Sequence, residues 1–324
     1  MSSGSEAADL LGITPASWRS SPLHGGDRIW PETNCYVDLW IELLPALGHP
    51  AEAALAFTVL QDFEGDHFTF FKFPPEDLQV LFGLAVQELP IFDTVEAQSM
   101  AQLRRGHPVL VEVDAFWLPD AGDAYRKAHM KTSIAVIALH PQERRLGYFH
   151  GTGYYELAGE DYDGLFREPA LLFPYAEFVK RDGKALDGGA LVDGSIALLR
   201  SHLDHRPRSH PIRQWQAALP AQMEMLGLRD MDYLHLYAFN GPRQLGANFE
   251  MLATYLDWLT TRGVGGLGEA AEAGRRLAEG AKAIQFQLAR MVHRRKLDAR
   301  AIDLEPLAAH YDTVFDTLDE RFSG

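Results

Sequence analysis

Cys35, the only cysteine of the chain, is the residue whose type and position best suit nucleophilic chemistry. It follows Thr33 and Asn34, a pair of helix-capping residues, and the chain after it is apolar at 36, 39, 40, 43, 44 and 47, the spacing of one helix face. Cys35 is therefore expected at the start of a helix, where exposed N–H groups and the helix dipole favour a thiolate. The alternative is a small buried apolar residue without chemistry.

A thiol nucleophile needs a base, usually a histidine, and a group that orients the base. His129 lies just before a predicted strand, His150 ends the next one, and Asp114 lies near the end of an earlier one. Strand ends bring distant side chains to one rim, so a helix packed across the sheet would let Cys35, one of the histidines and Asp114 converge. For His150 the alternative is a strand-end ring bonded to a neighbouring carbonyl.

Substrate contacts are predicted on both sides of the cysteine and in an acidic turn. Asn34 and Asp38 flank the thiol along the predicted helix, and Glu64, Asp66 and His67 form a turn that could hold a substrate amine or a metal. For Glu64, Asp66 and His67 a solvated acidic turn is the favoured interpretation. We predict no metal site and no cofactor.

The elements that must position these residues differ between the two halves of the chain. Apolar alternation predicts strands at 68–73, 86–89, 109–116, 133–139 and 146–150. In the first half, helical spacing predicts a helix that starts at Cys35 and is closed by Gly48-His49-Pro50, a second at 75–82, and a third whose last residues are 99–105. In the second half it predicts helices at 191–203, 211–226, 244–261, 268–294 and 300–322.

This pattern predicts an α+β protein: a unit with a helix packed on an antiparallel sheet, followed by a mainly helical domain. The predicted boundaries are an N-terminal surface arm at 1–27, the α+β domain at 28–189 and the helical domain at 190–324. Within the helical part, Asn248 and Glu250 stand among apolar residues and are expected in a buried polar network, either functional or structural.

Composition limits the class of partner. The 324 residues are 47% hydrophobic and carry a net charge of −15, which argues against non-specific binding to nucleic acid or to anionic membranes. No apolar run approaches the roughly 20 residues of a membrane span, and the first 22 residues lack a secretory pattern, so a cytoplasmic protein is expected. A small molecule is the easier ligand. An acidic carrier protein would need a basic patch, which Arg104-Arg105 or Arg294-Arg295-Lys296 could supply.

The sequence also resembles a bacterial family known mainly as a domain of unknown function. The resemblance covers nearly the whole chain and rests on these stretches: Asn34–Leu44 (NCYVDLWIELL), Asp62–Asp66, Phe68–Pro74, Val111–Asp114, Leu146–His150 and Gly159–Phe166. More remotely, the order of a cysteine helix, a strand ending in Asp114 and a histidine before a strand is similar to the N-terminal domain of the butirosin-biosynthesis acyltransferase. That domain belongs to the papain-like cysteine peptidase and transferase group.

This resemblance implies a papain-like fold and an enzyme that passes an aminoacyl group from a carrier-protein thioester to an amine through a cysteine acyl-enzyme. The chain departs from the papain-like pattern at three places. Thr132 stands where the base histidine directly precedes the strand, His150 stands where an Asp or Asn ends the next strand, and Ile29 replaces the glutamine that stabilises the oxyanion. The base would then be His129 or His150, with Asp114 orienting it. The backbone N–H of Cys35 and the amide of Asn34 would replace the missing donor.

The functional expectation is a cysteine-dependent acyl or aminoacyl transferase whose partners are a carrier protein and a small-molecule amine. An amide hydrolase on the same machinery differs only in whether water or an amine resolves the acyl-enzyme. The alternative from another class is a non-catalytic binding protein of papain-like fold for an aminoacylated carrier or a small amine.

Overall fold

The computed structural model describes residues 7–167 and 174–322, and the chain divides into two compact units. Unit 1 comprises Met1–Gly25, Asn34–Ala51 and Pro74–Leu186, and unit 2 comprises Gly26–Thr33, Glu52–Phe73 and Asp187–Gly324. Unit 1 contains an antiparallel sheet and unit 2 is mainly helical, so the predicted α+β class is confirmed. The units are interleaved in sequence, because the short segments 26–33 and 52–73 group with the helices.

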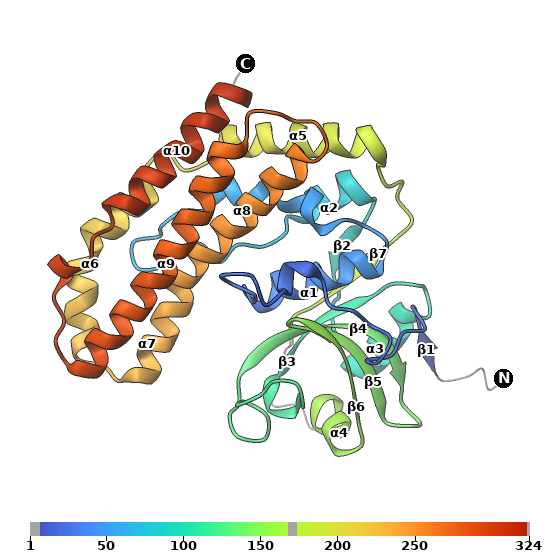
Figure 1. The fold of residues 1–324 in the computed structure, drawn as a ribbon. Coiled ribbons are helices and arrows are strands. Elements are labelled where there is room, and N and C mark those ends of the chain that lie inside the picture. Colours follow the sequence, from blue (N-terminus) through green and yellow to red (C-terminus); the bar gives the residue numbers. More distant parts are fainter. Residues whose placement is uncertain (1–6, 168–173, 323–324) are drawn as a thin grey trace. The chain divides into compact units, whose positions relative to one another are not determined.

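Unit 1 is built on a seven-stranded antiparallel sheet of order β2-β7-β3-β4-β5-β6, with β1 beside β4 (Figure 1). Its strands are β1 (Ala8–Asp9), β2 (Ala85–Glu88), β3 (Val109–Asp114), β4 (Lys131–His140), β5 (Arg145–His150), β6 (Gly153–Ala158) and β7 (Ala176–Lys180). Its helices are η1 (Pro22–His24), α1 (Cys35–Ala46), α2 (Pro75–Phe82), α3 (Val95–Leu103), η3 (Ala115–Trp117) and α4 (Glu160–Phe166). The predicted strands β2 to β5 are confirmed, whereas the sequence analysis missed β1, β6 and β7.

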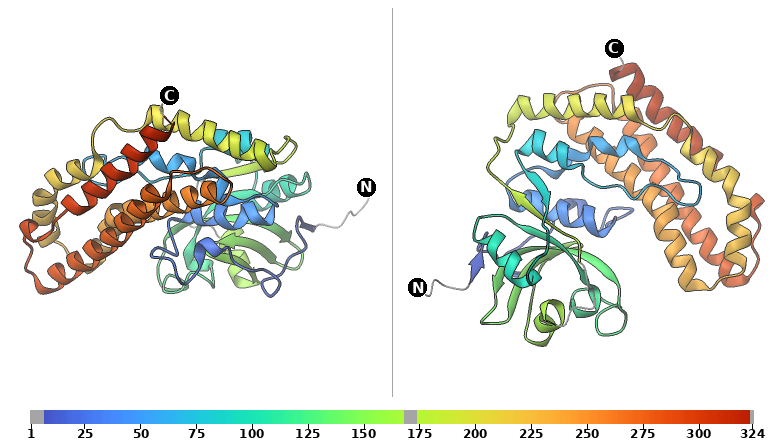
Figure 2. Two further views of the ribbon diagram at one scale, coloured as in Figure 1. Left: turned by 45° about the horizontal axis from the view of Figure 1, so that its top comes forward. Right: turned by 180° about the vertical axis from the view of Figure 1, so that it is seen from behind.

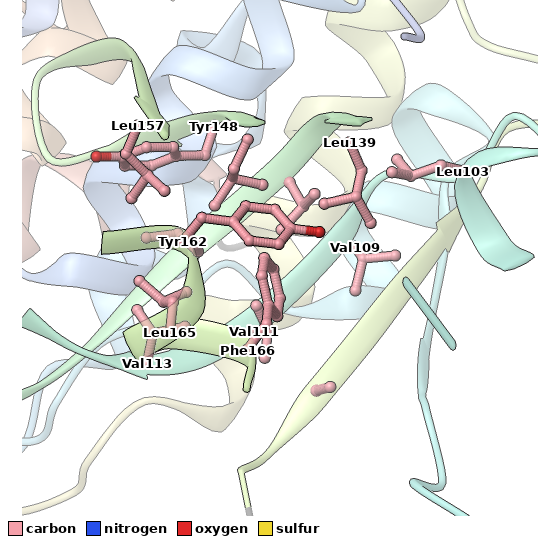
Figure 3. Packing of buried hydrophobic residues seen from close by; sticks show 14 of the residues in the cluster. Leu103, Val109, Val111, Val113, Leu139, Tyr148, Leu157, Tyr162, Leu165 and Phe166 are labelled. Carbon is pink, nitrogen blue, oxygen red and sulfur yellow. The ribbon is translucent and has the colours of Figure 1, made fainter. Parts of the chain in front are cut away.

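One face of this sheet packs into a large apolar core. Alternating residues of β3 and β4, among them Val111, Val113, Ile134 and Val136, point into this core together with side chains from α3 and α4. Figure 3 shows the ring of Tyr162 from α4 in the middle of the cluster. The β-branched residues that predicted these strands are thus the residues that fill the core.

A bulge interrupts the alternation of β4. The register with β5 pairs Val136 with Tyr148 and Ala138 with Gly147, so one extra residue is accommodated between them. After the bulge Leu139 points to the same core as Val136, although the two residues are three apart. The core face is therefore kept along the whole strand.

Helix α1 lies across the opposite face, where it packs against β4, β5 and β6 (Figure 1). Its residues from Tyr36 to Leu44 are all buried, including Asp38 and Glu42. The helix begins at Cys35, as the sequence predicts, because the Asn34 side chain accepts a hydrogen bond from the Val37 N–H at 3.0 Å. Local capping chemistry thus fixes the position of the cysteine.

The predicted N-terminal arm is tied to α1 by a buried polar cluster. The Glu42 carboxylate accepts hydrogen bonds from Trp18 Nε1 at 2.7 Å and from the Ser21 N–H at 2.9 Å, and it lies 2.6 Å from Nδ1 of His24. Nε2 of His24 lies 3.4 Å from Asp38. Burial alone lowers the pKa of His24, but hydrogen bonds to the two carboxylates and their charges outweigh burial and raise it to about 9. His24 is therefore an imidazolium at neutral pH.

This cluster predicts an alkaline loss of stability. Because the pKa of His24 rises from 6.5 to about 9 on folding, its contribution is fully present below pH 6.5 and is lost as the pH rises through about 9. We expect the free energy of unfolding to fall by roughly 3 kcal/mol across this window. Urea unfolding of the wild type and of His24→Gln, at several pH values, measures the difference. A variant that keeps the wild-type pH slope would contradict the assignment, and His129→Gln serves as the control for an exposed histidine.

Unit 2 consists mainly of long helices, and Figure 2 shows α8, α9 and α10 packed along one another in two further views. Its elements are η2 (Ala51–Leu60), α5 (Gly188–His205), α6 (Pro211–Gly227), α7 (Met231–Ala238), η4 (Phe239–Arg243), α8 (Gln244–Thr260), α9 (Gly268–Arg294), η5 (Ala299–Ala301) and α10 (Glu305–Phe322). The five predicted helices are confirmed, and α7 was missed. Among the described residues, no helix combines the length and the apolar character needed to cross a bilayer.

The predicted strand at 68–73 is wrong. Apart from an isolated bridge between Phe63 and Phe68, this segment has no strand pairing. The Phe68 N–H bonds instead to the carbonyl of Asn240, and its ring packs against Trp215 at 5.4 Å. The aromatic spacing therefore reflects packing among helices and not a sheet.

The buried polar residues of α8 hold the two short segments within unit 2. Asn248 donates a hydrogen bond to the Thr58 carbonyl at 2.8 Å. Glu250 accepts from the N–H groups of Ile29 and Trp30 at 2.9 and 2.8 Å, and Arg28 lies 3.4 Å from the same carboxylate. These side chains satisfy irregular backbone, so the network expected at Asn248 and Glu250 is structural.

Candidate functional site

The Cys35 thiol lies at the N-terminus of α1, against the sheet of unit 1. Its hydrogen-bond partner among the described residues is the Ser133 hydroxyl of β4, with Sγ and Oγ 3.8 Å apart. Neither His129 nor His150 is hydrogen bonded to the thiol. Cys35 is half-buried.

Strand register shows which other side chains share the face of the sheet that carries Ser133. Ser133 pairs with Glu112 and Lys131 pairs with Asp114, and residues two apart on a strand point to the same side. An ion pair of 2.6 Å between Lys131 and Glu112 confirms the shared face. The side chain of Asp114 therefore leaves β3 on the same face as the residue that contacts Cys35.

Asp114 and His129 form a hydrogen-bonded pair at the end of this face. Nδ1 of His129 lies 2.6 Å from Asp114 Oδ2, while Oδ1 accepts from the N–H groups of Phe116 and Met130. The carboxylate is buried, with 7% of the side chain exposed, whereas 67% of the His129 side chain is exposed. The ring stacks on Phe116 at 4.5 Å. Asp114 thus favours the tautomer that carries its proton on Nδ1, which leaves Nε2 as the basic atom.

His150 belongs to a separate network on the opposite, core-facing side. Its Nδ1 lies 2.5 Å from Asp120, its Nε2 lies 2.9 Å from the Thr132 hydroxyl, and Tyr148 donates to the same Asp120 carboxylate. Thr132 is adjacent to Ser133 on β4 and therefore points away from it. Both ring nitrogens of His150 are engaged, so of the two predicted bases only His129 has a free nitrogen and a carboxylate on the Cys35 face.

A second polar group near α1 was not foreseen from the sequence. Glu177 of β7 is 8% exposed, and its two oxygens accept hydrogen bonds from Tyr36 and Tyr175, each at 2.9 Å. Burial is the main cause that raises the pKa of Tyr36, and the charge of Glu177 raises it further. Burial also raises the pKa of Tyr175, to about 12, with the hydrogen bond to Glu177 as the second cause. Among the described residues Glu177 has no cationic partner. It is a buried carboxylate held by two phenols, and Tyr36 directly follows the cysteine.

The remaining predicted contact residues lie in other surroundings. Asn34 caps α1, and Asp38 is buried beside His24, so both have structural partners within unit 1. Glu64 and Asp66 lie in an exposed turn of unit 2. There the Glu64 carboxylate accepts a hydrogen bond from the Thr69 hydroxyl, and the Asp66 carboxylate lies within hydrogen-bond distance of the ring of its neighbour His67. In the described part of the chain, no group of three or more His, Cys, Asp or Glu side chains is arranged to hold a metal ion.

A cavity of about 300 Å³ opens beside β3. Its lining includes residues 111–114 of β3, Trp117 and, from α4, Leu165 and Phe166, so it lies on the core-facing side of the sheet.

Ser133 and Glu177 are the two site residues that sequence reasoning missed. A weak signal existed for each, because a single polar residue in an otherwise apolar strand is expected to have a buried partner. For Ser133 the signal was masked by Thr132, its equally polar neighbour. For Glu177 the strand itself was not predicted.

The two histidines should respond differently to substitution. His150→Gln leaves the buried Asp120 without its ring partner, so we expect a loss of about 1–3 kcal/mol in the free energy of unfolding. His129→Gln removes an exposed ring, and Asp114 keeps two backbone donors, so we expect a change within about 0.5 kcal/mol. Urea unfolding of both variants measures the contrast. Equal losses in the two variants would show that the exposed ring is also structural.

Two family models match the chain. One, described as the DUF1839 N-terminal domain, matches residues 19–181, and the other, described as the DUF1839 C-terminal domain, matches residues 188–320. The expected relation to a family of unknown function is thereby confirmed. No curated protein matches the chain.

Proposed function

The chain belongs to the DUF1839 family, and from the side chains on its Cys35 face we propose that it is a cysteine-dependent acyltransferase. The single observation that carries the proposal is the His129–Asp114 pair, a base with its orienting carboxylate on the sheet face that Cys35 contacts. The order of these residues also fits the remote likeness to the papain-like butirosin-type acyltransferases. Cys35 is the proposed nucleophile, His129 the general base and acid, and Asp114 the orienting group.

The proposed reaction has two displacements. In the first, Nε2 of His129 takes the thiol proton and Sγ of Cys35 attacks a thioester carbonyl. The bond from the carbonyl carbon to the donor sulfur breaks, and the departing thiolate takes the proton from His129. In the second, an amine attacks the Cys35 thioester, His129 removes a proton from the nitrogen, and the thiol is restored with an amide as product.

His129 and Cys35 are not hydrogen bonded in the unliganded protein. Catalytic hydrogen bonds often close only in the substrate complex, so the proposal requires Nε2 to reach the thiol when the donor is bound. The first N–H groups of a helix have no partner within the helix, so the backbone N–H of Cys35 is suited to the oxyanion. The side-chain oxygen of Asn34 accepts from the Val37 N–H, so the donors proposed for the oxyanion are the backbone N–H of Cys35 and the NH₂ group of the Asn34 side chain.

Glu177 supports an amine as the acyl acceptor. A buried carboxylate without a cation is costly, and an ammonium group would supply the missing charge while the phenols of Tyr36 and Tyr175 offer ring faces and oxygens to it. Because Tyr36 follows Cys35 directly, an amine held by this carboxylate would lie near the nucleophile.

A non-catalytic binding protein is the second candidate. It is favoured by the contact between Cys35 and Ser133, since the thiol meets a hydroxyl and not an imidazole. Such a protein would bind an aminoacylated carrier or an amine on the same face without forming an acyl-enzyme.

Incubation with a small aminoacyl thioester, such as the N-acetylcysteamine thioester of glycine, tests the proposal. We expect a peptide containing Cys35 to gain the mass of the acyl group, and the adduct to disappear when a primary amine is added. His129→Gln should slow acylation by roughly 10²- to 10⁴-fold and Asp114→Asn by less. His150→Gln is the matched control and should acylate at the wild-type rate.

Cys35→Ser separates the two candidates. An enzyme loses turnover and adduct, whereas a binding protein keeps its affinity for the thioester. Absence of any adduct in the wild type, with affinity retained, would decide for the binding protein.

The amine site predicts a selective effect of Glu177→Gln. We expect the KM for a cationic amine to rise about tenfold or more, with acylation of Cys35 by the thioester unchanged, because the amide has nearly the same shape and still accepts from one phenol but carries no charge. Glu76→Gln, an exposed carboxylate of the same unit, is the charge-matched control. If Glu177→Gln slows acylation and leaves the amine KM unchanged, Glu177 positions α1 and does not bind the acceptor.

A further inference from the structure

A groove at one end of unit 2 combines exposed apolar side chains with unpaired positive charge. It encloses about 840 Å³ where the end of α6, the start of α7 and the end of α9 come together (Figure 1). One wall comes from residues 226–233 and Leu236, and the other comes from Val292, His293, Arg295 and Leu297.

The apolar part of the groove is unusually exposed. Leu228 is 88% exposed and Leu236 is 63% exposed, and both belong to the same wall. Packing within the protein does not explain either side chain, because neither is covered. Exposed apolar side chains that line a concave surface with a polar rim are typical of interaction sites.

The edge of the groove at the end of α9 is basic in an otherwise acidic chain. Four cations form no ion pair with any described residue. Two of them line the groove, and the other two are their neighbours in the sequence. The four are Arg229, Arg294, Arg295 and Lys296. The lining holds two cations, Arg229 and Arg295, and two carboxylates, Asp230 and Asp232, so the excess of positive charge comes from Arg294 and Lys296 beside it. The net charge of the whole chain is −15. The dipole of α9 favours the cations at its C-terminal end, and the dipole of α6 favours Arg229, which lies just past the C-terminal end of that helix on the other wall.

We propose that this groove docks an acidic, amphipathic helix of a partner protein. An apolar side chain of that helix would lie between Leu228 and Leu236, and its carboxylates would face the cations of both walls. The proposal rests on the proposed function only in identifying the partner as the acidic helical carrier that delivers the acyl thioester. Of the two basic patches that the sequence offers, it selects Arg294-Arg295-Lys296 over Arg104-Arg105.

The test measures binding without chemistry. Full-length protein carrying Cys35→Ala is titrated with an apo acyl carrier protein at about 0.15 M salt. In this background we expect the double variant Arg229→Glu/Lys296→Glu to weaken binding by about tenfold or more and to flatten its salt dependence. Leu228→Ser should weaken binding severalfold and leave the salt dependence unchanged. The substituted side chains are exposed, so the thermal unfolding midpoint should stay constant.

The matched control is Arg104→Glu/Arg105→Glu, which changes the net charge by the same amount at the other patch and should alter affinity less than about twofold. Equal weakening by the two double variants would overturn the proposal, because the attraction would then be non-specific. Failure of the wild-type groove to bind the carrier would also overturn the proposal. Binding of anionic vesicles with the same dependence on Arg229 and Lys296 would overturn it too, because the groove would then recognise a membrane surface. If Cys35 forms no acyl adduct but the carrier still binds through the groove, the proposed acyltransferase activity is wrong and the docking proposal stands.

Discussion

The alternation of side chains along β4 is the constraint on which the arrangement of unit 1 depends. Thr132 and Ser133 are neighbours in sequence, yet the pleat sends one toward the core-facing network of His150 and the other toward Cys35. A slip of one residue in the register would exchange the two faces and remove both contacts. The strand therefore separates His150, whose two ring nitrogens are hydrogen bonded on the core-facing side, from the face that carries Cys35 and Asp114.

The sequence predicted those parts of the site that depend on local signals. The cap at Asn34 and the apolar spacing of α1 located Cys35, and the strand ends located Asp114 beside His129, because helix starts and strand ends are encoded by a few adjacent residues. Which face of the sheet the helix covers is a long-range property. For that reason His129 and His150 could not be told apart before the register was known.

The failures of sequence reasoning have the same origin. The aromatic residues at 68–73 alternate as in a strand, but the Phe68 backbone bonds to Asn240, a partner 172 positions away that no local pattern reveals. Likewise, nothing near His24 indicated that its ring would meet Asp38 and Glu42 inside the protein. A segment without periodicity is not necessarily a loose surface arm when a helix elsewhere in the chain presents buried carboxylates to it.

The interleaving of the two units has a consequence for biosynthesis. Unit 2 takes residues 26–33 and 52–73 from within the stretch that supplies unit 1, and Glu250 and Asn248 bind the backbone of those early segments. A nascent chain that has reached only β7 therefore carries two segments whose partners have not been made. These contacts of high sequence separation close late and slowly, so completion of the fold must wait until α8 has left the ribosome.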